Sequence, residues 1–327
     1  MPAARATLRP RDISRLLTAA GREADRREAS PPPQPKKSDL PTRLLVSAVG
    51  IPLGFLVVWS GGWVLLLTLL FLAVVGTHEV LGFARARGVQ PFAALALPAA
   101  GLLLLSTILS GGTVQGWSYP ALGIVTGSAL LALAAAVFLR GPEGNPLAAA
   151  AVTVLAPLYV AVPLAFGWFL RHHPAADWSA PGWAGTGLVL LPIIATWLGD
   201  TTAYFGGRAM GRRKLLPSVS PAKTVEGAFC GLGGAVAGAL LVVGVFFPLM
   251  GGAEPLSLGA AAVLGLIIGA VAQVGDLAES ALKREAGIKD SGSILPGHGG
   301  VLDRFDAILF TLPLTWLLLP FFLANGL

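Results

Sequence analysis

The chain has 327 residues, of which 54% are hydrophobic and only 12% are charged, and it carries a formal net charge of +6. This composition is too apolar for an ordinary soluble domain, and a single cysteine excludes an intramolecular disulfide framework. A positive net charge is also common among nucleic-acid-binding proteins. Here the basic residues lie between long hydrophobic blocks, so we expect a lipid bilayer and no nucleic acid as the partner.

The N-terminal segment, residues 1–41, is polar and contains the run Pro31-Pro-Pro-Gln-Pro35. It holds no apolar stretch of the kind that a secretory signal peptide has. Polar, proline-rich segments bury too little apolar surface to fold alone. We therefore expect a disordered, basic tail beside anionic lipid, with a site for a partner protein as the less favoured alternative.

The hydrophobic segments that follow the tail are each long enough to cross a bilayer as a helix. The sequence thus predicts an all-α, polytopic integral membrane protein with about nine transmembrane helices. Residues 42–182 hold the first five, and residues 183–327 hold the rest together with polar loops at 208–225 and 278–304. The predicted spans are 43–60, 62–82, 92–110, 118–139, 147–170, 183–206, 227–249, 256–278 and 305–324.

Lysine and arginine are distributed unevenly among the segments between these spans. If the N-terminus is cytoplasmic, every one of the 23 residues except Arg171 falls on the cytoplasmic side. Cytoplasmic loops of membrane proteins carry such an excess of positive charge. We therefore expect a multi-pass protein of the plasma membrane whose N-terminus, two polar loops and active site face the cytoplasm.

Glycines recur at every third or fourth position of the seventh predicted span, at Gly227, Gly231, Gly234 and Gly238. Small residues at this spacing let two helices approach closely, so close packing is expected, either within the chain or across a homodimer interface. Glu79 is a different kind of feature, an acid inside the second span near its cytoplasmic end. An entrance for lipid is one role for it, and its role stays open.

Two acids at the ends of spans are expected to face a polar cavity. Asp200 lies near the cytoplasmic end of the sixth span, and an Asp at the centre of a membrane helix costs roughly 2.5–3.5 kcal/mol. Asp276 ends the eighth span, and on a helix Ser280 and Lys283 share its face because they follow at i+4 and i+7. A surface ion pair at a helix end is the alternative interpretation of Asp276.

The densest group of charges outside the tail lies in loop 278–304 and at its two ends. Carboxylate oxygens there can hold a hard cation, basic side chains can neutralise phosphates, and glycines let backbone N–H groups approach an anion. Together these groups indicate phosphoryl or nucleotidyl transfer. The acids are Asp276, Asp303 and Asp306, the cations are Lys283, Arg284, Lys289 and Arg304, and the glycines are Gly297, Gly299 and Gly300.

This stretch resembles the signature of the phosphatidate cytidylyltransferase family, whose members are also called CDP-diacylglycerol synthases. Two further segments are similar to that family, Asp200-Thr-Thr-Ala-Tyr204 and Ser220-Pro-Ala-Lys-Thr-Val-Glu-Gly227. So many fixed positions make a chance match improbable, and the resemblance covers about residues 196–310. The matching positions of the signature are Ser280, Lys283-Arg284, Lys289-Asp290, His298-Gly299-Gly300 and Asp303-Arg304-Phe305-Asp306.

The resemblance implies the reaction of CTP with phosphatidate to give CDP-diacylglycerol and pyrophosphate, in phospholipid biosynthesis. It also implies Mg²⁺ on Asp276 and Asp303, while the presence of a second cation stays open. The residues that it places in catalysis are Asp276, Lys283, Arg284, Asp303 and Arg304. The residues that it places in substrate binding are Asp200, Ser220, Lys223, Thr224, Ser280, Lys289, His298, Gly299 and Gly300.

Other interpretations of these residues are weaker. The basic side chains would serve as positive-inside anchors without any fixed spacing, and a lone histidine such as His298 is usually without a role. A CTP-dependent lipid kinase of the polyprenol or phytol type would use a similar site but transfer the γ-phosphate to an alcohol. An ion-coupled transporter would use the intramembrane acids, but the polar residues gather at one membrane face and no inverted repeat is evident.

The predicted topology can be tested with reporter fusions. A reporter placed after Leu327 is expected outside the cytoplasm, because an odd number of spans follows a cytoplasmic N-terminus. A reporter inserted in loop 208–225 is expected in the cytoplasm. Activity of both reporters on the same side of the membrane would contradict the nine-span topology.

Overall fold

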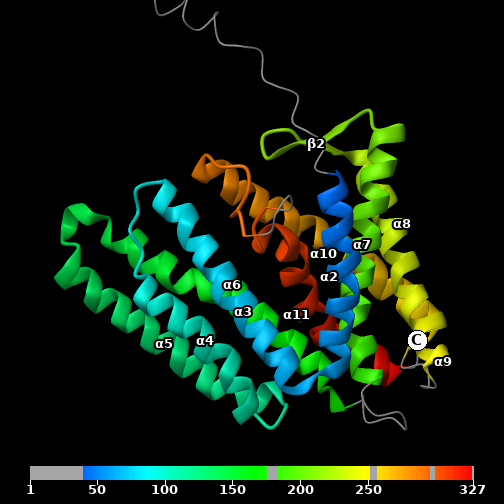
Figure 1. Cartoon of the computed structure of the whole chain (residues 1–327), viewed down its shortest axis with the longest axis horizontal. Coiled ribbons are helices and arrows are strands. Elements are labelled where there is room, and N and C mark those ends of the chain that lie inside the picture. The colour runs from blue at the N-terminus through cyan, green and yellow to red at the C-terminus, as the bar shows by residue number, and fades with distance from the viewer. Residues whose placement is uncertain (1–39, 175–182, 251–255, 295–298, 326–327) are drawn as a thin grey trace, which may run out of the picture. The chain divides into compact units, whose positions relative to one another are not determined.

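The computed structural model describes residues 40–174, 183–250, 256–294 and 299–325. Residues 1–39 of the predicted tail 1–41 lie outside the described residues, as does the segment 295–298 with His298, while residues 40–41 begin the first described helix. Residues Thr42–Leu327 form one unit of packed helices (Figure 1).

Every predicted span coincides with a helix of the described residues, so the all-α prediction is confirmed. Seven of the spans are long and apolar enough to cross a membrane, and Ala48–Ser60 and Ala93–Leu109 are shorter apolar helices. A π-helical turn, η3 (Val242–Phe246), joins α8 to α9, so that the seventh span is continuous. The helices are α2 (Leu40–Ser60), α3 (Gly62–Ala86), α4 (Ala93–Leu109), α5 (Val114–Leu139), α6 (Pro146–Arg171), α7 (Trp183–Met210), α8 (Val225–Leu241), α9 (Phe247–Leu249), α10 (Leu258–Ala286) and α11 (Leu302–Asn325).

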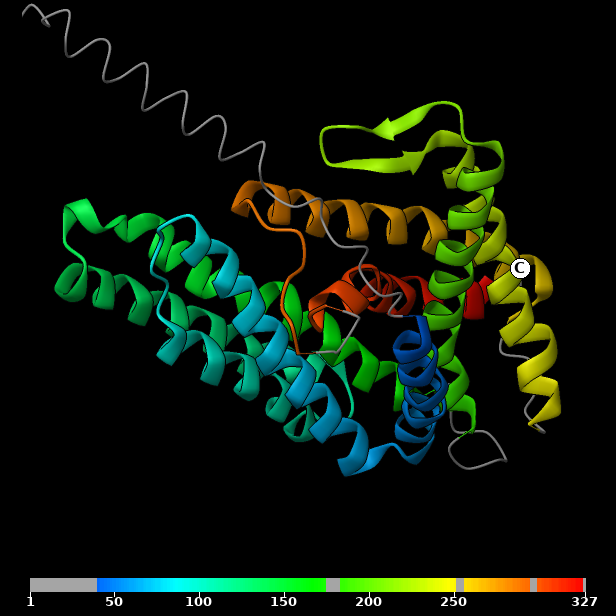
Figure 2. The ribbon, with the colours of Figure 1, turned by 45° about the horizontal axis from the view of Figure 1, so that its top comes forward.

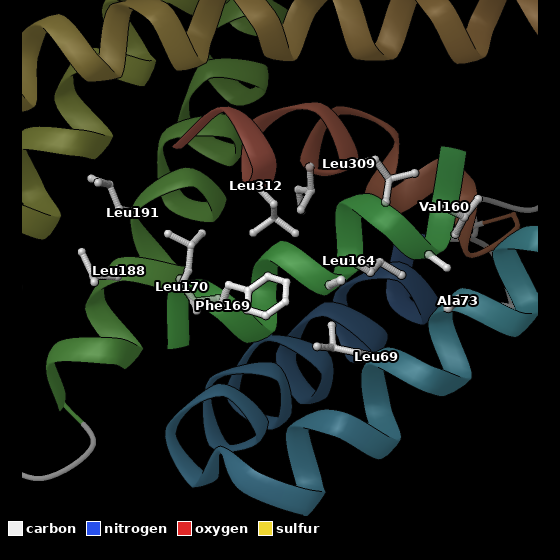
Figure 3. Packing of buried hydrophobic residues seen from close by; sticks show 14 of the residues in the cluster. Leu69, Ala73, Val160, Leu164, Phe169, Leu170, Leu188, Leu191, Leu309 and Leu312 are labelled. Atoms are coloured by element: carbon white, nitrogen blue, oxygen red, sulfur yellow. The ribbon is translucent and has the colours of Figure 1, made fainter. Parts of the chain in front are cut away.

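The helices form two groups that share one core. Helices α3, α4, α5 and α6 pack on one another, and α7, α8, α10 and α11 do the same (Figure 1). Helix α6 joins the groups because it also contacts α7 and α11. Figure 3 shows Phe169 of α6 between Leu69 of α3 and Leu312 of α11. Apolar side chains of both groups are therefore buried against the same central helix.

The glycines of α8 pack against α7, which confirms the expected close approach of two helices. A Cβ on Gly231 would lie 3.0 Å from the Ala203 Cβ, and a Cβ on Gly234 would lie 2.6 Å from the Leu198 carbonyl oxygen. The two backbones can approach so closely because side chains are missing between them. The small-residue stripe is thus used inside the chain, while a homodimer interface stays a prediction.

The first polar loop holds a short β-hairpin that the sequence reasoning did not predict. Strand β1 (Lys214–Leu216) pairs antiparallel with β2 (Ser220–Thr224). Thr224 ends the hairpin and begins α8, since its hydroxyl oxygen accepts a hydrogen bond from the Gly227 N–H at 3.1 Å. Figure 2 shows the hairpin beside α10, and the Arg284 Nε donates to the Val219 carbonyl at 3.3 Å. The hairpin is therefore held to the helix that carries Asp276.

Arg171, the last residue of α6, binds the end of α2 where α2 meets α3. Its guanidinium donates to the carbonyl oxygens of Val58 at 2.8 Å and Trp59 at 2.9 Å. These carbonyls belong to the last turn of α2, where no further helical N–H is available to them. The end of α6 thus supplies the hydrogen bonds that a C-terminal cap would otherwise make.

Neighbouring glycines of α8 offer a matched test of this packing. A Cβ on Gly234 would lie only 2.0 Å from the Thr202 Oγ1, whereas a Cβ on Gly233 has no heavy atom within 4 Å. Gly234→Ala is therefore expected to destabilise the protein by about 1–3 kcal/mol through overpacking. Gly233→Ala is expected to be neutral or slightly stabilising, because Ala favours a helix by about 1 kcal/mol over Gly. Equal melting temperatures of the two variants in detergent would contradict the packing.

Candidate active site

A cavity of about 640 Å³ lies where α7, the β-hairpin, α8, α10 and α11 meet. Most of the predicted site residues line it, although they come from segments far apart in the sequence. Those residues are Asp200, Lys223, Thr224, Asp276, Ser280, Lys283, Arg284, Lys289, Asp303 and Arg304. Ser220, Gly299 and Gly300 do not line it, and His298 lies outside the described residues.

Several other described residues line the wall without having been assigned to catalysis, substrate binding or metal from the sequence, and of these Asp306 was named only in the acid group and the signature. Tyr204 and Arg208 follow Asp200 on α7, and the Arg208 Nη1 lies 3.3 Å from the Tyr204 hydroxyl oxygen. Gln273 and Asp306 lie one turn from Asp276 and Asp303, and Leu215 comes from β1. Helical spacing from the predicted acids was the signal that could have found Gln273 and Arg208.

Asp276 joins α10 to the hairpin. Its Oδ2 forms an ion pair with the Lys223 Nζ, and its Oδ1 accepts a hydrogen bond from the Ser280 Oγ at 3.3 Å. Ser280 and Lys283 both line the cavity with Asp276, so the expected shared helix face is confirmed. The Asp276 side chain is 30% exposed, which leaves it open to the cavity.

Lys283 lies between two carboxylates that are more deeply buried. Its Nζ is 2.6 Å from the Asp303 Oδ1 and 2.5 Å from the Glu279 Oε2. The Glu279 side chain has no exposed surface, and the side chains of Asp303 and Lys283 are 8% and 11% exposed. A buried carboxylate without such a partner would be strongly destabilising. Lys283 therefore ties α10 to α11 and lines the cavity at the same time.

The second carboxylate oxygen of Asp303 is held by the segment that precedes α11. It accepts hydrogen bonds from the backbone N–H groups of Ser291 and Gly300, each at 2.8 Å. Gly299 has φ +82°, a conformation that favours glycine, and a Cβ there would lie 2.6 Å from the same oxygen. The Gly300 N–H of the glycine-rich turn thus binds the Asp303 carboxylate. A contact of this turn with substrate stays a prediction.

Acids and bases are nearly balanced around the cavity. Its described lining residues include five carboxylates and six basic side chains. The charges of Asp200 and Asp276 both act on Asp306, so these acids repel one another across the cavity. Such carboxylates could hold a divalent cation, and the six basic side chains could contact phosphate groups.

The donor set fits Mg²⁺ that is held jointly with a phosphorylated substrate. Within the described residues, no three His, Cys, Asp or Glu side chains are grouped to hold a metal ion on their own. Asp276 and Asp303 nevertheless open on the same cavity. Mg²⁺ in proteins is commonly bound by one or two carboxylates together with substrate phosphates and water. Asp276 and Asp303 could serve as these two carboxylates.

Glu79, whose role the sequence left open, does not line the cavity. Its side chain is buried, with 4% of the residue exposed. Its Oε1 accepts a hydrogen bond from the Val301 N–H at 2.9 Å, and its Oε2 accepts from the Leu302 N–H at 2.7 Å. The sequence showed only that Glu79 is an acid inside a span. It could not show that the hydrogen-bond partners of Glu79 are Val301 and Leu302, more than 200 residues away.

Comparisons with known proteins show which family the chain belongs to. The model of the cytidylyltransferase family matches residues 41–322. A phosphatidate cytidylyltransferase of Synechocystis is 33% identical over 308 residues, which are 86% of this chain and 98% of the relative. A phosphatidate cytidylyltransferase of Bacillus subtilis is 44% identical over 138 residues, 42% of this chain and 49% of the relative. One of Brucella abortus is 42% identical over 160 residues, 45% of this chain and 57% of the relative.

Proposed function

Because the chain belongs to the cytidylyltransferase family, we propose how its cavity transfers a cytidylyl group from CTP to phosphatidate. Its activity is that of a phosphatidate cytidylyltransferase, a nucleotidyltransferase of phospholipid synthesis in the membrane. The observation that carries the mechanism is that Asp276 and Asp303, each paired with a lysine, line one cavity together with Arg284, Lys289 and Arg304.

The reaction joins two anions, so positioning and neutralisation of charge are the main tasks of the site. A phosphate oxygen of phosphatidate attacks the α-phosphorus of CTP in line. The new bond joins that oxygen to the α-phosphorus, and the bond between the α-phosphorus and the bridging oxygen breaks to release pyrophosphate. Lys223, Arg284, Lys289 and Arg304 hold phosphates of the two substrates, since all four line the cavity. Little proton removal is needed, because the attacking group is already an anion.

Asp276 and Asp303 would hold Mg²⁺, which when bound neutralises charge on the phosphate oxygens and polarises them. In the structure both carboxylates are paired with lysines, Asp276 with Lys223 and Asp303 with Lys283. Each lysine also lines the cavity, so it can exchange its carboxylate for a phosphate when substrate binds. The lysines thus neutralise the carboxylates before substrate binds and contact the phosphates afterwards.

The cavity is placed on the cytoplasmic side in this proposal. The distribution of Lys and Arg supports that orientation, and CTP is a cytoplasmic substrate. Phosphatidate reaches the same cavity from the membrane surface, next to the exposed aromatic side chains of Tyr204 and Phe205. Aromatic residues are enriched at such interfaces.

Product analysis tests the proposed reaction directly. Purified protein with CTP, phosphatidate, a lipid alcohol such as phytol and Mg²⁺ is expected to release pyrophosphate and CDP-diacylglycerol in equal amounts. Formation of CDP together with a phosphorylated lipid would show γ-phosphate transfer, the reaction of a lipid kinase. Absence of any product in a folded, monodisperse sample would contradict an enzyme of either kind.

Substitution of the two proposed metal ligands tests the mechanism. Asp276→Asn and Asp303→Asn remove charge at constant size, and each is expected to lower kcat by roughly two orders of magnitude, about 3 kcal/mol. Asp290→Asn is the control, because Asp290 lies in the same wall but is exposed and should have a milder effect.

Melting temperatures separate this effect from misfolding. Asp276→Asn should melt close to the wild-type temperature, because its carboxylate is partly exposed. Asp303→Asn should melt lower, since it also loses a buried ion pair with Lys283. Turnover close to wild type in both variants at saturating Mg²⁺ would remove the metal assignment.

A further inference from the structure

Glu79 is a buried acid that the mechanism above does not use. It comes from α3, in the group of helices that contributes no described residue to the cavity wall. Figure 2 shows the segment after α10 running from the end of that helix towards α11, past α3. The Ser291 Oγ in this segment donates to the Glu79 Oε2 at 2.9 Å. The contact joins parts of the chain that are 212 residues apart.

The carboxylate of Glu79 acts as a cap for α11 that is supplied by another helix. It accepts hydrogen bonds from the N–H groups of Val301 and Leu302, and Leu302 is the first residue of α11. The first N–H groups of a helix lack partners within it, and the helix dipole favours negative charge there. Glu79 thus fixes the start of the helix that carries Asp303.

The chain leaves room for this carboxylate by means of two glycines. A Cβ on Gly292 would lie 2.5 Å from the Glu79 Oε1, and a Cβ on Gly300 would lie 2.6 Å from the same oxygen. Either distance is far below ordinary van der Waals contact. Gly300 therefore has a packing reason at this position that is separate from any contact with a phosphate.

Ser291 connects Glu79 to the cavity. Its Oγ lies 2.9 Å from the Glu79 Oε2 and 3.0 Å from the Asp303 Oδ2, and its backbone N–H donates to that Asp303 oxygen at 2.8 Å. A serine hydroxyl has one proton, so it donates to one carboxylate at a time. The remaining backbone N–H bonds hold both acids in place whichever one receives the proton.

We propose that Glu79 is a positioning residue for Asp303. It holds Ser291 and the first turn of α11, and these groups in turn fix the Asp303 carboxylate at the cavity wall. The proposal rests on the proposed function in so far as Asp303 acts in catalysis. It assigns the first group of helices a part in the site, although none of its described side chains lines the cavity.

The test compares Glu79→Gln with Glu143→Gln, the same change at an exposed carboxylate on the turn η1 (Pro142–Gly144). The amide NH₂ of the glutamine would point its hydrogens at groups that are themselves donors, the N–H groups of Val301 and Leu302 and the Ser291 hydroxyl. The hydrogen bonds that cap α11 should therefore weaken. For Glu79→Gln we expect kcat to fall at least about tenfold, because a shift of the Asp303 carboxylate by about 1 Å would be costly in catalysis. The KM for CTP should change less than about threefold, since other residues hold the phosphates. The Mg²⁺ concentration for half-maximal rate should rise, and Glu143→Gln should match wild type in all three.

Hydrogen–deuterium exchange supplies a readout that does not depend on activity. The amides of Val301 and Leu302 are expected to exchange faster in Glu79→Gln than in wild type or Glu143→Gln. Unchanged exchange would overturn the cap, and a kcat within about twofold of wild type would overturn the positioning role. A loss confined to KM would also overturn it. If wild-type protein forms no CDP-diacylglycerol, the proposed function fails while the exchange experiment still decides the cap.

Ser291→Ala is the second variant, for the case in which Glu79→Gln gives too little folded protein. It removes the hydroxyl bridge and leaves the carboxylate of Glu79 on α11. A kcat lowered at least about threefold with an unchanged KM for CTP would support the bridge. Wild-type kcat together with wild-type exchange at Val301 would overturn it.

Discussion

Lys283 contacts Glu279 on its own helix and Asp303 on α11, and the shape of the site depends on this three-charge contact. Each charge is buried at the edge of an apolar helix bundle, where an unpaired charge is costly. Loss of both contacts of Lys283 at once would carry that cost, so in the substrate-free site the lysine holds α10 and α11 in one relative position. The cavity wall that contains Asp276, Arg304 and Asp306 is built on those same two helices.

The other wall depends on the packing of α7 with α8. Glycines at the contact bring the backbones together, and the hairpin between the two helices is thereby placed beside α10. Lys223 can then reach Asp276, 53 residues further along the chain. The packing of α7 on α8 thus places the hairpin, and the ion pair with Asp276 then fixes Lys223 at the site.

The helices and most of the wall were predictable from sequence because both leave local signals. A span requires about 20 apolar residues, and the spacing of Asp276, Ser280 and Lys283 puts them on one face of a helix. The pairing of Lys223 with Asp276 and the bonds from Glu79 to Val301 were not predictable in this way. They join segments that no local spacing relates, and they exist only after several helices have packed. The hairpin was also missed, since its two short strands lie within a loop that is mostly polar.

The contact of Arg171 with the last turn of α2 has a consequence for biogenesis. The two carbonyl groups that it binds precede it by 113 and 112 residues. On a ribosome, α2 and α3 are therefore complete, and α4 and α5 have followed, before the guanidinium exists. Until then, the carbonyl groups of Val58 and Trp59 must accept hydrogen bonds from water or lipid headgroups. The pair of α2 and α3 can acquire its final form only when α6 has been inserted, so maturation of the N-terminal hairpin is coupled to the synthesis of a helix three places later.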